Sequence, residues 1–176
     1  MAGARNSTRG TAGKLTAREP GGIRLRPPLP GESAALTALC LRSKAHWGYS
    51  ETFMRACTNE LTLRENDLAT ETIRVAEADG TPAGMAEISV AGHEACLEKL
   101  FVEPGFMGRG VGRLLMAWAR DEAMKRGATT MTIDADPDAA GFYRRHGAQD
   151  AGRTPSGSIP GRMLPRLVLD LDLRRQ

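Results

Sequence analysis

The chain has 176 residues, 41% of them hydrophobic, which is enough for one globular domain with a core. No stretch approaches the roughly 18 apolar residues that a membrane-spanning helix needs, so we expect no membrane partner. The three cysteines lie far apart and form no CxxC pair, which argues against a disulfide framework and predicts no metal site. Unpaired cysteines also indicate a reducing compartment, and we expect a cytoplasmic protein.

The charge is concentrated in the N-terminal segment. Residues 1–22 hold four of the 24 basic residues and one of the 21 acidic residues, so residues 23–176 hold 20 of each and are neutral. A neutral domain argues against nucleic acid as the main partner, because binding to a phosphate backbone requires a basic face. Residues 1–22 are rich in Gly, Ser, Thr, Ala and Arg and have no apolar periodicity. They are predicted to form a disordered tail rather than a transit peptide, and residues 23–176 to form the domain.

The first half of the domain is predicted to contain a strand, two helices and a hairpin. Ser50 is a suitable N-cap for the second helix. The pair Asp79-Gly80 is typical of a hairpin turn between two strands. In chain order these elements are a strand at 23–26, helices at 32–46 and from 50, and strands at 72–76 and 83–90.

The second half alternates strands and helices. The helix that begins near residue 110 is expected to end at Gly127, since a glycine after basic residues is a common helix terminator. The elements are strands at 94–102, 129–134, 148–152 and 164–171, helices at 110–126 and 138–146, and a loop at 153–161. The order β-α-α-β-β-β-α-β-α-β-β predicts a single α/β domain whose mixed, mostly antiparallel central sheet is flanked by helices, with a parallel crossover within 95–134.

The most specific motif is the glycine-rich turn that follows Val102-x-Pro104. Four glycines occur within eight residues, directly before the apolar face of a helix. The start of a helix carries unpaired N–H groups and a partial positive charge. Glycines allow a phosphate to approach these N–H groups because no Cβ stands in the way. The sequence therefore predicts a phosphate-binding turn.

Two other phosphate-binding motifs fit this turn less well. The dinucleotide fingerprint G-x-G-x-x-G requires a glycine where this sequence has Arg113, and the predicted hairpin upstream does not suit an all-parallel fold. Asp134, at the end of the next strand, does stand where a ribose-binding acid would lie. A nucleotide-linked oxidoreductase thus remains an alternative. No Gly-Lys-Ser/Thr of a Walker A loop occurs.

The turn resembles motif A of the GNAT superfamily of N-acetyltransferases, through Val102-x-Pro104 and Gly108-x-Gly110-x-Gly112. The segment 141–147, Gly-Phe-Tyr-Arg-Arg-His-Gly, is also similar to the family, and the predicted strand order agrees over residues 23–172. The resemblance implies the GNAT fold, acetyl-CoA as co-substrate and an amine of a small molecule or peptide as acceptor. It further implies direct transfer in a ternary complex and suggests a homodimer. The alternative is a non-catalytic acyl-CoA-binding sensor module.

The resemblance also implies which residues bind acetyl-CoA. The pantetheine arm is expected along the end of the strand at 100–102, and the pyrophosphate on the N–H groups of 107–113. Two positions depart from the family pattern: Met107 replaces a usual Gln or Arg, and Asp136 stands in a region where Asn is frequent. The predicted cofactor-binding residues are Leu100, Phe101, Val102, Met107, Gly108, Arg109, Gly110, Val111, Gly112, Arg113 and Asp136.

Two residues are candidates for proton transfer. The family usually directs a tyrosine from the position of Tyr143 toward the thiol, so Tyr143 is the predicted acid; packing against the sheet is the alternative role. Glu98 is the predicted base. It lies two residues before Leu100, so both side chains are expected on one side of the strand, a parity that Glu94 shares. A solvent-facing position is the alternative for Glu98.

The segment between the first two helices is the predicted acceptor site, because this region borders the acceptor pocket in the family. Trp47 and Tyr49 are predicted to line the pocket, and His46 to orient the acceptor or act as a base; anchoring of a helix corner is the alternative for the aromatic residues. The loop at 153–161 is either a cover over the acceptor or an ordinary surface loop. Cys96 is not expected to be a nucleophile, because buried cysteines are usually inert.

Overall fold

The computed structural model describes residues 22–172, so the predicted tail lies outside the described residues except for its last position. The elements in chain order are β1 (Ile23–Arg26), α1 (Ser33–Ala45), α2 (Glu51–Leu61), α3 (Glu65–Thr70), β2 (Thr72–Ala78), β3 (Thr81–Ala91), β4 (Glu94–Val102), the 3-10 turn η1 (Pro104–Phe106), α4 (Val111–Lys125), β5 (Thr130–Asp134), α5 (Ala140–Arg145), β6 (Gln149–Pro155) and β7 (Met163–Asp170). Within these residues, no helix has the length and apolar character needed to cross a bilayer.

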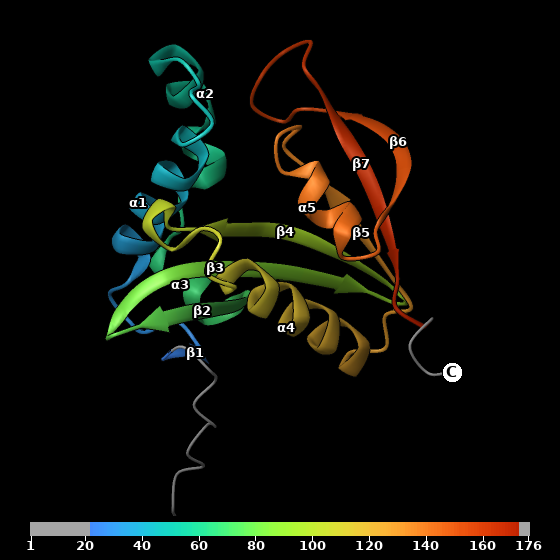
Figure 1. Cartoon of the computed structure of the whole chain (residues 1–176), viewed down its shortest axis with the longest axis horizontal. Helices are drawn as coiled ribbons and strands as arrows, with labels where there is room; N and C mark the ends of the chain where they lie inside the picture. Colours follow the sequence, from blue (N-terminus) through green and yellow to red (C-terminus); the bar gives the residue numbers. More distant parts are fainter. Residues whose placement is uncertain (1–21, 173–176) are drawn as a thin grey trace, which may run out of the picture.

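The strands form one seven-stranded sheet in the order β1-β2-β3-β4-β5-β7-β6 (Figure 1). Every neighbouring pair is antiparallel except β4 and β5, which are parallel. The predicted mixed, mostly antiparallel sheet is therefore confirmed. The alternative dinucleotide-binding fold is wrong for this chain, because that fold needs an open sheet of mostly parallel strands.

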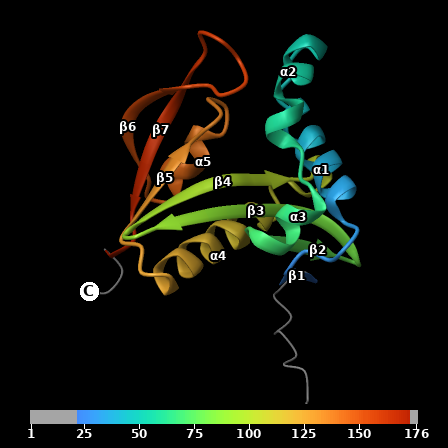
Figure 2. The ribbon, with the colours of Figure 1, turned by 180° about the vertical axis from the view of Figure 1, so that it is seen from behind.

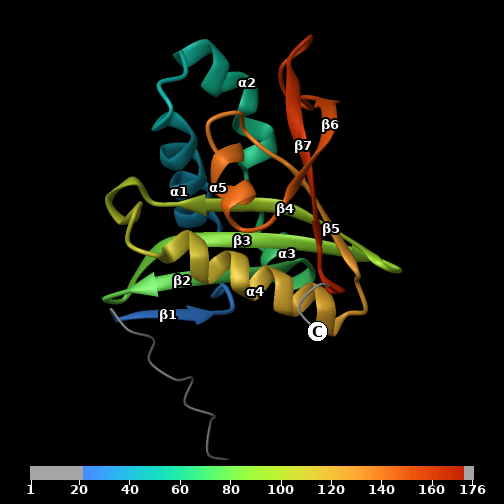
Figure 3. The same ribbon diagram turned by 45° about the vertical axis from the view of Figure 1, so that its right-hand side comes forward.

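Helices cover both faces of this sheet. Val75 packs with α1 and α2 in one buried cluster, whereas its neighbour Ala76 packs with α4 in another. Successive residues of a strand point to opposite faces, so these clusters mark the two sides of the sheet. Figure 3 shows α4 lying along β2 and β3. Figures 1 and 2 show α2 and the connected ends of β6 and β7 rising on the same side of β4.

Most local signals predicted the correct element. The hydroxyl of Ser50 accepts a hydrogen bond from the N–H of Phe53 at 3.3 Å, as an N-cap does. Asp79 and Gly80 both have positive φ, at 48° and 79°, which is the conformation of a tight hairpin turn. The cap and the turn confirm the predicted start of α2 and the predicted position of the β2–β3 hairpin turn, although both strands run closer to the turn than predicted.

Two elements differ from the prediction. Helix α3, which was not predicted, has six residues and buries none of them, so it carries no apolar periodicity. Strand β6 continues to Pro155, and the loop before β7 therefore begins at residue 156 rather than 153. Nearly all of β6 is exposed at the edge of the sheet, and an edge strand without a buried face lacks the alternation that sequence analysis uses.

Gly84 in β3 determines how closely α4 approaches the sheet. A Cβ at this position would lie 2.8 Å from Val111 Cγ1 and 2.9 Å from the carbonyl oxygen of Phe101. Only glycine leaves room for the first turn of α4 against β3 and β4. This contact fixes the start of α4, and with it the glycine-rich turn, beside the end of β4.

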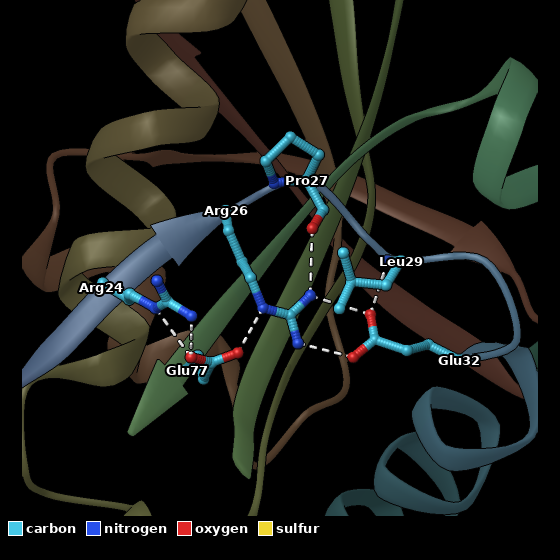
Figure 4. A network of polar contacts seen from close by, with 6 residues as sticks. All are labelled: Arg24, Arg26, Pro27, Leu29, Glu32 and Glu77. Atoms are coloured by element: carbon cyan, nitrogen blue, oxygen red, sulfur yellow. Dashed lines mark hydrogen bonds and ion pairs between the residues drawn. The ribbon is translucent and has the colours of Figure 1, made fainter. Parts of the chain in front are cut away.

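A network of ionic contacts joins β1 to β2 and to the start of α1 (Figure 4). Glu77 accepts hydrogen bonds from Arg24 at 2.7 Å and from Arg26 at 2.5 Å. Arg26 also donates two hydrogen bonds to Glu32, and Glu32 in turn accepts one from the N–H of Leu29 at 2.7 Å. The side chains of Glu77 and Arg26 are only 8% and 12% exposed, so the pair is protected from solvent. This network fastens the first strand to the rest of the sheet.

Replacing Glu77 by glutamine is expected to lower the free energy of unfolding at pH 7 by about 2 kcal/mol, because charge-assisted hydrogen bonds to Arg24 and Arg26 are weakened. The hydrogen bond from Arg26 holds the pKa of Glu77 below its ordinary value of 4.5. Stabilisation from a lowered carboxyl pKa is complete above pH 4.5 and is lost as the pH falls through the folded pKa. In thermal unfolding, the difference from wild type should shrink between pH 7 and pH 3. The control Glu51→Gln, at an exposed pair with Arg55, should have little effect. Identical melting temperatures for Glu77→Gln and wild type at pH 7 would contradict this account.

Candidate active site

The site begins where β4 and β5 separate. The two strands pair only from Glu94 opposite Thr130 to Cys96 opposite Thr132, although β4 continues to Val102. The diverging strands leave a wedge that opens into a cavity of about 470 Å³. Its walls come from β4, the end of β5, the glycine-rich turn and α5. A cavity of this size is typical of small-molecule sites.

The main chain of β4 presents a hydrogen-bond donor to this wedge. N–H groups alternate between the two edges of a strand, and the N–H of Glu103 donates to the carbonyl of Ala83 on the β3 side at 2.9 Å. Leu100 and Val102 therefore direct their N–H groups toward the wedge. The N–H of Val102 donates to the hydroxyl of Ser43 at 3.2 Å. Within residues 22–172 the N–H of Leu100 has no acceptor, so it is available to a ligand.

The glycine-rich turn has the backbone geometry that a phosphate site requires. Gly108 and Gly110 have φ values of 75° and 87°, which favour glycine, and a Cβ added to either would meet nothing within 4 Å. Gly110 is the N-cap of α4, a helix of 15 residues. In the described part of the chain, the N–H groups of 110–113 have no backbone or side-chain acceptor. The turn therefore presents a row of free donors at the positive end of a helix.

Two arginines stand beside this row of donors. Arg113 and Arg145 line the cavity, and neither forms an ion pair with a carboxylate of the described residues. Arg109 does not line the cavity; its guanidinium lies 4.8 Å above the ring of Phe106. The thioether of Met107 lines the cavity but cannot donate a hydrogen bond. Phosphate recognition at this turn would thus use backbone N–H groups with Arg113 and Arg145.

Tyr143 lies in the wall of the same cavity. It is 6% exposed, and within the described range its hydroxyl has no hydrogen-bond partner. Burial, with a smaller contribution from Asp136, raises the pKa of Tyr143 above the ordinary value of 10. The ring packs edge-on against Phe142, which in turn lies 3.3 Å from the position of a Cβ on Gly112. Tyr143 therefore both packs against its neighbours and lines the cavity.

Glu98 is the extra residue of a β-bulge. In the pairing of β3 with β4, Glu87 lies opposite Lys99 and Ile88 lies opposite Leu97, so Glu98 has no partner. Bulges bend a strand and redirect its side chains, and they are frequent next to active sites. Lys99 pairs with Glu87 across the bulge at 2.9 Å.

The bulge corrects one expectation about Glu98. Leu100 packs with Ile88 in the core on the α4 face, whereas the hydroxyl of Ser89, on the opposite face, donates to Glu98 at 2.6 Å. Glu98 and Leu100 therefore do not share a side of the strand, because the parity count assumed a regular strand. Glu94 and Glu98 are both exposed, as the solvent-facing alternative expected for Glu98, and Glu94 lines neither cavity. Glu98 itself lines the wedge cavity and the cavity next to it.

The carboxylate of Asp136 is used in contacts within the protein. It accepts a hydrogen bond from the hydroxyl of Tyr49 at 2.7 Å and lies 3.5 Å from both Arg162 and Lys44. Arg162 also donates to the Tyr49 hydroxyl at 2.6 Å and covers the Phe53 ring at 4.8 Å. Burial and Asp136 raise the pKa of Tyr49 to about 12. Asp136 lines the wedge, but its carboxylate joins three segments rather than remaining free for a cofactor.

The predicted acceptor residues between α1 and α2 have different surroundings. Trp47 is 40% exposed and lines the wedge cavity. Tyr49 stacks on Phe53 at 4.1 Å between ring centroids and lines neither cavity. His46 is exposed, lies edge-on to Trp47 and also lines neither cavity. Of the three, only Trp47 lines either of the two cavities.

A second cavity, of about 540 Å³, adjoins the wedge. The two share lining residues from α2, β4, β5 and β7, so they lie side by side. The loop at 156–162 forms one wall: Ser158 hydrogen-bonds to Glu60 of α2, and Ile159 packs against the cluster that includes α2. Cys96 also lines this cavity, and burial together with Glu98 raises the pKa of its thiol to about 12.

The structure brings together most of the predicted residues and adds others. Predicted residues that line the wedge are Trp47, Glu98, Leu100, Phe101, Val102, Met107, Gly108, Gly110, Gly112, Arg113, Asp136 and Tyr143. Those that do not are His46, Tyr49, Arg109 and the buried Val111. Residues not predicted but present in or beside the site are Ser43, Lys44, Glu60, Lys99, Arg145 and Arg162. Arg145 lies in the segment 141–147 and had a local signal; the others had none. Among residues 22–172, no His, Cys, Asp and Glu side chains are grouped as a metal site.

Comparison with known proteins agrees with this architecture. Residues 39–148 match the acetyltransferase (GNAT) family. Over 86 residues the chain is 35% identical to streptothricin acetyltransferase of Streptomyces lavendulae. Over 71 residues it is 25% identical to the uncharacterized protein YyaT of Bacillus subtilis. These matches cover 46% and 40% of this chain, and the chain spans about half the length of the curated relatives it matches, 46% and 48%.

Two solved structures have the same fold. The GCN5-related N-acetyltransferase from Rhodopseudomonas palustris superposes with a TM-score of 0.71 at 26% identity, over 85% of this chain and 96% of that one. The PaiA N-acetyltransferase from Thermoplasma acidophilum, solved in complex with coenzyme A, superposes with a TM-score of 0.68 at 18% identity, over 84% and 98%. The family match spans more than half of the chain, including the glycine-rich turn and Tyr143. The chain therefore belongs to the GNAT family of acetyltransferases.

Proposed function

We propose that this acetyltransferase moves the acetyl group of acetyl-CoA to an amine of a small molecule or peptide, by direct transfer in a ternary complex. The observation that carries the proposal is the wedge between β4 and β5, a single cavity lined by the glycine-rich turn, Glu98 and Tyr143. Free N–H groups and two unpaired arginines fit a pyrophosphate, and an acid–base pair fits group transfer. When bound, acetyl-CoA supplies the activated acetyl group.

Glu98 and Leu100 are proposed to assist the attack of the acceptor amine on the thioester. An ammonium has no lone pair, so the acceptor amine must lose a proton as it attacks the thioester carbonyl. Glu98 lines both cavities, and this position supports the proposal that its carboxylate takes this proton directly or through a water. The free N–H of Leu100 is the proposed donor to the oxygen that becomes negative during attack.

Tyr143 is proposed to protonate the sulfur of the leaving group. The sulfur leaves with the electron pair of the carbon–sulfur bond and needs a proton. Tyr143 lines the wedge, and its phenol, whose pKa is raised above 10, is protonated at neutral pH. It donates its proton to the sulfur and recovers one from solvent. The net result is an amide, a free thiol and an unchanged protein.

Direct transfer is supported by the state of Cys96. A nucleophilic cysteine needs a low pKa, because the thiolate is the reactive form. Burial and Glu98 raise the pKa of Cys96 to about 12 instead, so its thiol is protonated at neutral pH. An acetyl-cysteine intermediate is therefore not part of the proposal.

The test is the release of free thiol from acetyl-CoA across a panel of amines. With both substrates varied, direct transfer should give intersecting double-reciprocal plots, and Cys96→Ser should keep wild-type turnover. Parallel plots together with an inactive Cys96→Ser would show transfer through the cysteine instead. Tight CoA binding without thiol release for any amine would favour the non-catalytic sensor module.

A further inference from the structure

We infer that the second cavity binds a small acceptor that carries another cationic group besides the amine to be acetylated. The inference rests on the proposed function, because it takes this cavity as the acceptor site. The cavity adjoins the wedge and shares Glu60 and Glu98 with it, and its volume of about 540 Å³ suits a small molecule. The class of acceptor follows from the charges that line it.

The ionisable groups of this cavity are not balanced. Glu60, Glu98, Lys99 and Asp134 line it, together with the protonated Cys96. Two of these charges are neutralised from outside the cavity. Lys99 pairs with Glu87 at 2.9 Å, and Asp134 pairs with Arg166 at 2.7 Å. Two carboxylates, those of Glu60 and Glu98, remain.

Neither remaining carboxylate has a basic partner among residues 22–172. Glu98 accepts a hydrogen bond from the hydroxyl of Ser89, and Glu60 accepts one from the hydroxyl of Ser158. These hydroxyls orient the carboxylates without neutralising them. The lining of this cavity therefore carries two carboxylates without an ion pair, both on exposed residues, although the domain as a whole is neutral. Such a lining attracts cations and repels anions.

The two carboxylates lie on different elements, so each can bind a different cationic group of one acceptor. Glu98 lies on the bulge of β4, beside the proposed thioester position at Leu100, and needs only the reacting amine. Glu60 lies in the last turn of α2 and is held by the loop at 156–162. A monoamine at Glu98 would leave the charge of Glu60 without a partner. A diamine provides a cation for each.

The test compares amines of equal chain length, 1,4-diaminobutane with n-butylamine and 1,5-diaminopentane with n-pentylamine. We expect kcat/KM to be about tenfold higher for each diamine, since charge-assisted contacts add to the same alkyl burial. Glu60→Gln keeps an acceptor for Ser158 but removes the charge. It should raise the diamine KM by about fivefold and leave monoamine kinetics and kcat nearly unchanged. The preference should also weaken with added salt.

Glu51→Gln is the matched control, because Glu51 lies in the same helix, is 83% exposed and lines neither cavity. Calorimetric titration of 1,4-diaminobutane into the protein held with CoA gives the same comparison without turnover. An equal diamine-to-monoamine ratio in wild type and Glu60→Gln would overturn the inference and leave the proposed function intact. Failure of every amine, monoamines included, to release thiol would count against both.

Discussion

Replacing Gly110 by valine is expected to abolish CoA binding while the fold survives. Gly110 has a φ of 87° and lines the wedge, and a Cβ there would meet nothing within 4 Å. A branched side chain would occupy the space of a phosphate and would strain the backbone that aims the N–H groups of 110–113. Losing several charge-assisted hydrogen bonds should weaken CoA binding by about 100-fold or more, measured by calorimetry.

Gly105→Val is the control for the effect of an added side chain in this segment. Gly105 has no positive φ, a Cβ there meets nothing within 4 Å, and it does not line the wedge. This variant should bind CoA as wild type does. Far-ultraviolet circular dichroism of Gly110→Val should be native. Unchanged CoA affinity in Gly110→Val would remove the glycine-rich turn from the model of the site.

The Tyr143→Phe variant is expected to lower kcat by about 100-fold, a typical effect of losing a general acid. Its affinity for CoA should stay within twofold, because the hydroxyl helps the sulfur to leave and does not hold the cofactor. The hydroxyl has no hydrogen-bond partner in residues 22–172, so phenylalanine loses no internal contact. The melting temperature should therefore equal or exceed that of wild type.

The pH profile adds a second measurement for Tyr143. Burial raises its pKa above the ordinary value of 10, so the phenol should remain the acid form throughout the assay range. The wild-type kcat should then show no fall from ionisation of this group below pH 10. A kcat for Tyr143→Phe that matches wild type, with native stability, would leave Tyr143 only its packing role beside Phe142.

Local patterns were sufficient for those parts of the site that depend on neighbours in the chain. Val102-x-Pro104 and the glycines of 108–112 identified the turn, because a run of positive φ values before a helix needs glycine at set positions. The free N–H groups of 110–113 follow from the same local geometry. Tyr143 was found because it lies in a short motif after a predicted strand.

Other parts of the site depend on pairing between strands. The bulge that redirects Glu98 arises because the register between β3 and β4 shifts by one residue. The alternation of residues along a single strand cannot reveal such a shift. Edge strand β6 and helix α3 bury too little to leave a periodic pattern. Arg145 belongs to the motif at 141–147 that the sequence analysis identified. Its position at the cavity could not be predicted, because it depends on how α5 packs against the sheet.

The amino-acid sequence by itself determined the order of the strands, the helices other than α3, the glycine-rich turn and the family, since these rest on local patterns along the chain. Only the tertiary structure decided which charges remain unpaired around the site. Asp136 accepts a hydrogen bond from Tyr49, and Lys99 pairs with Glu87, whereas Glu60 and Glu98 have no basic partner among residues 22–172. The reason is physical: an ion pair depends on distances between segments far apart in the chain, and the fold alone sets those distances.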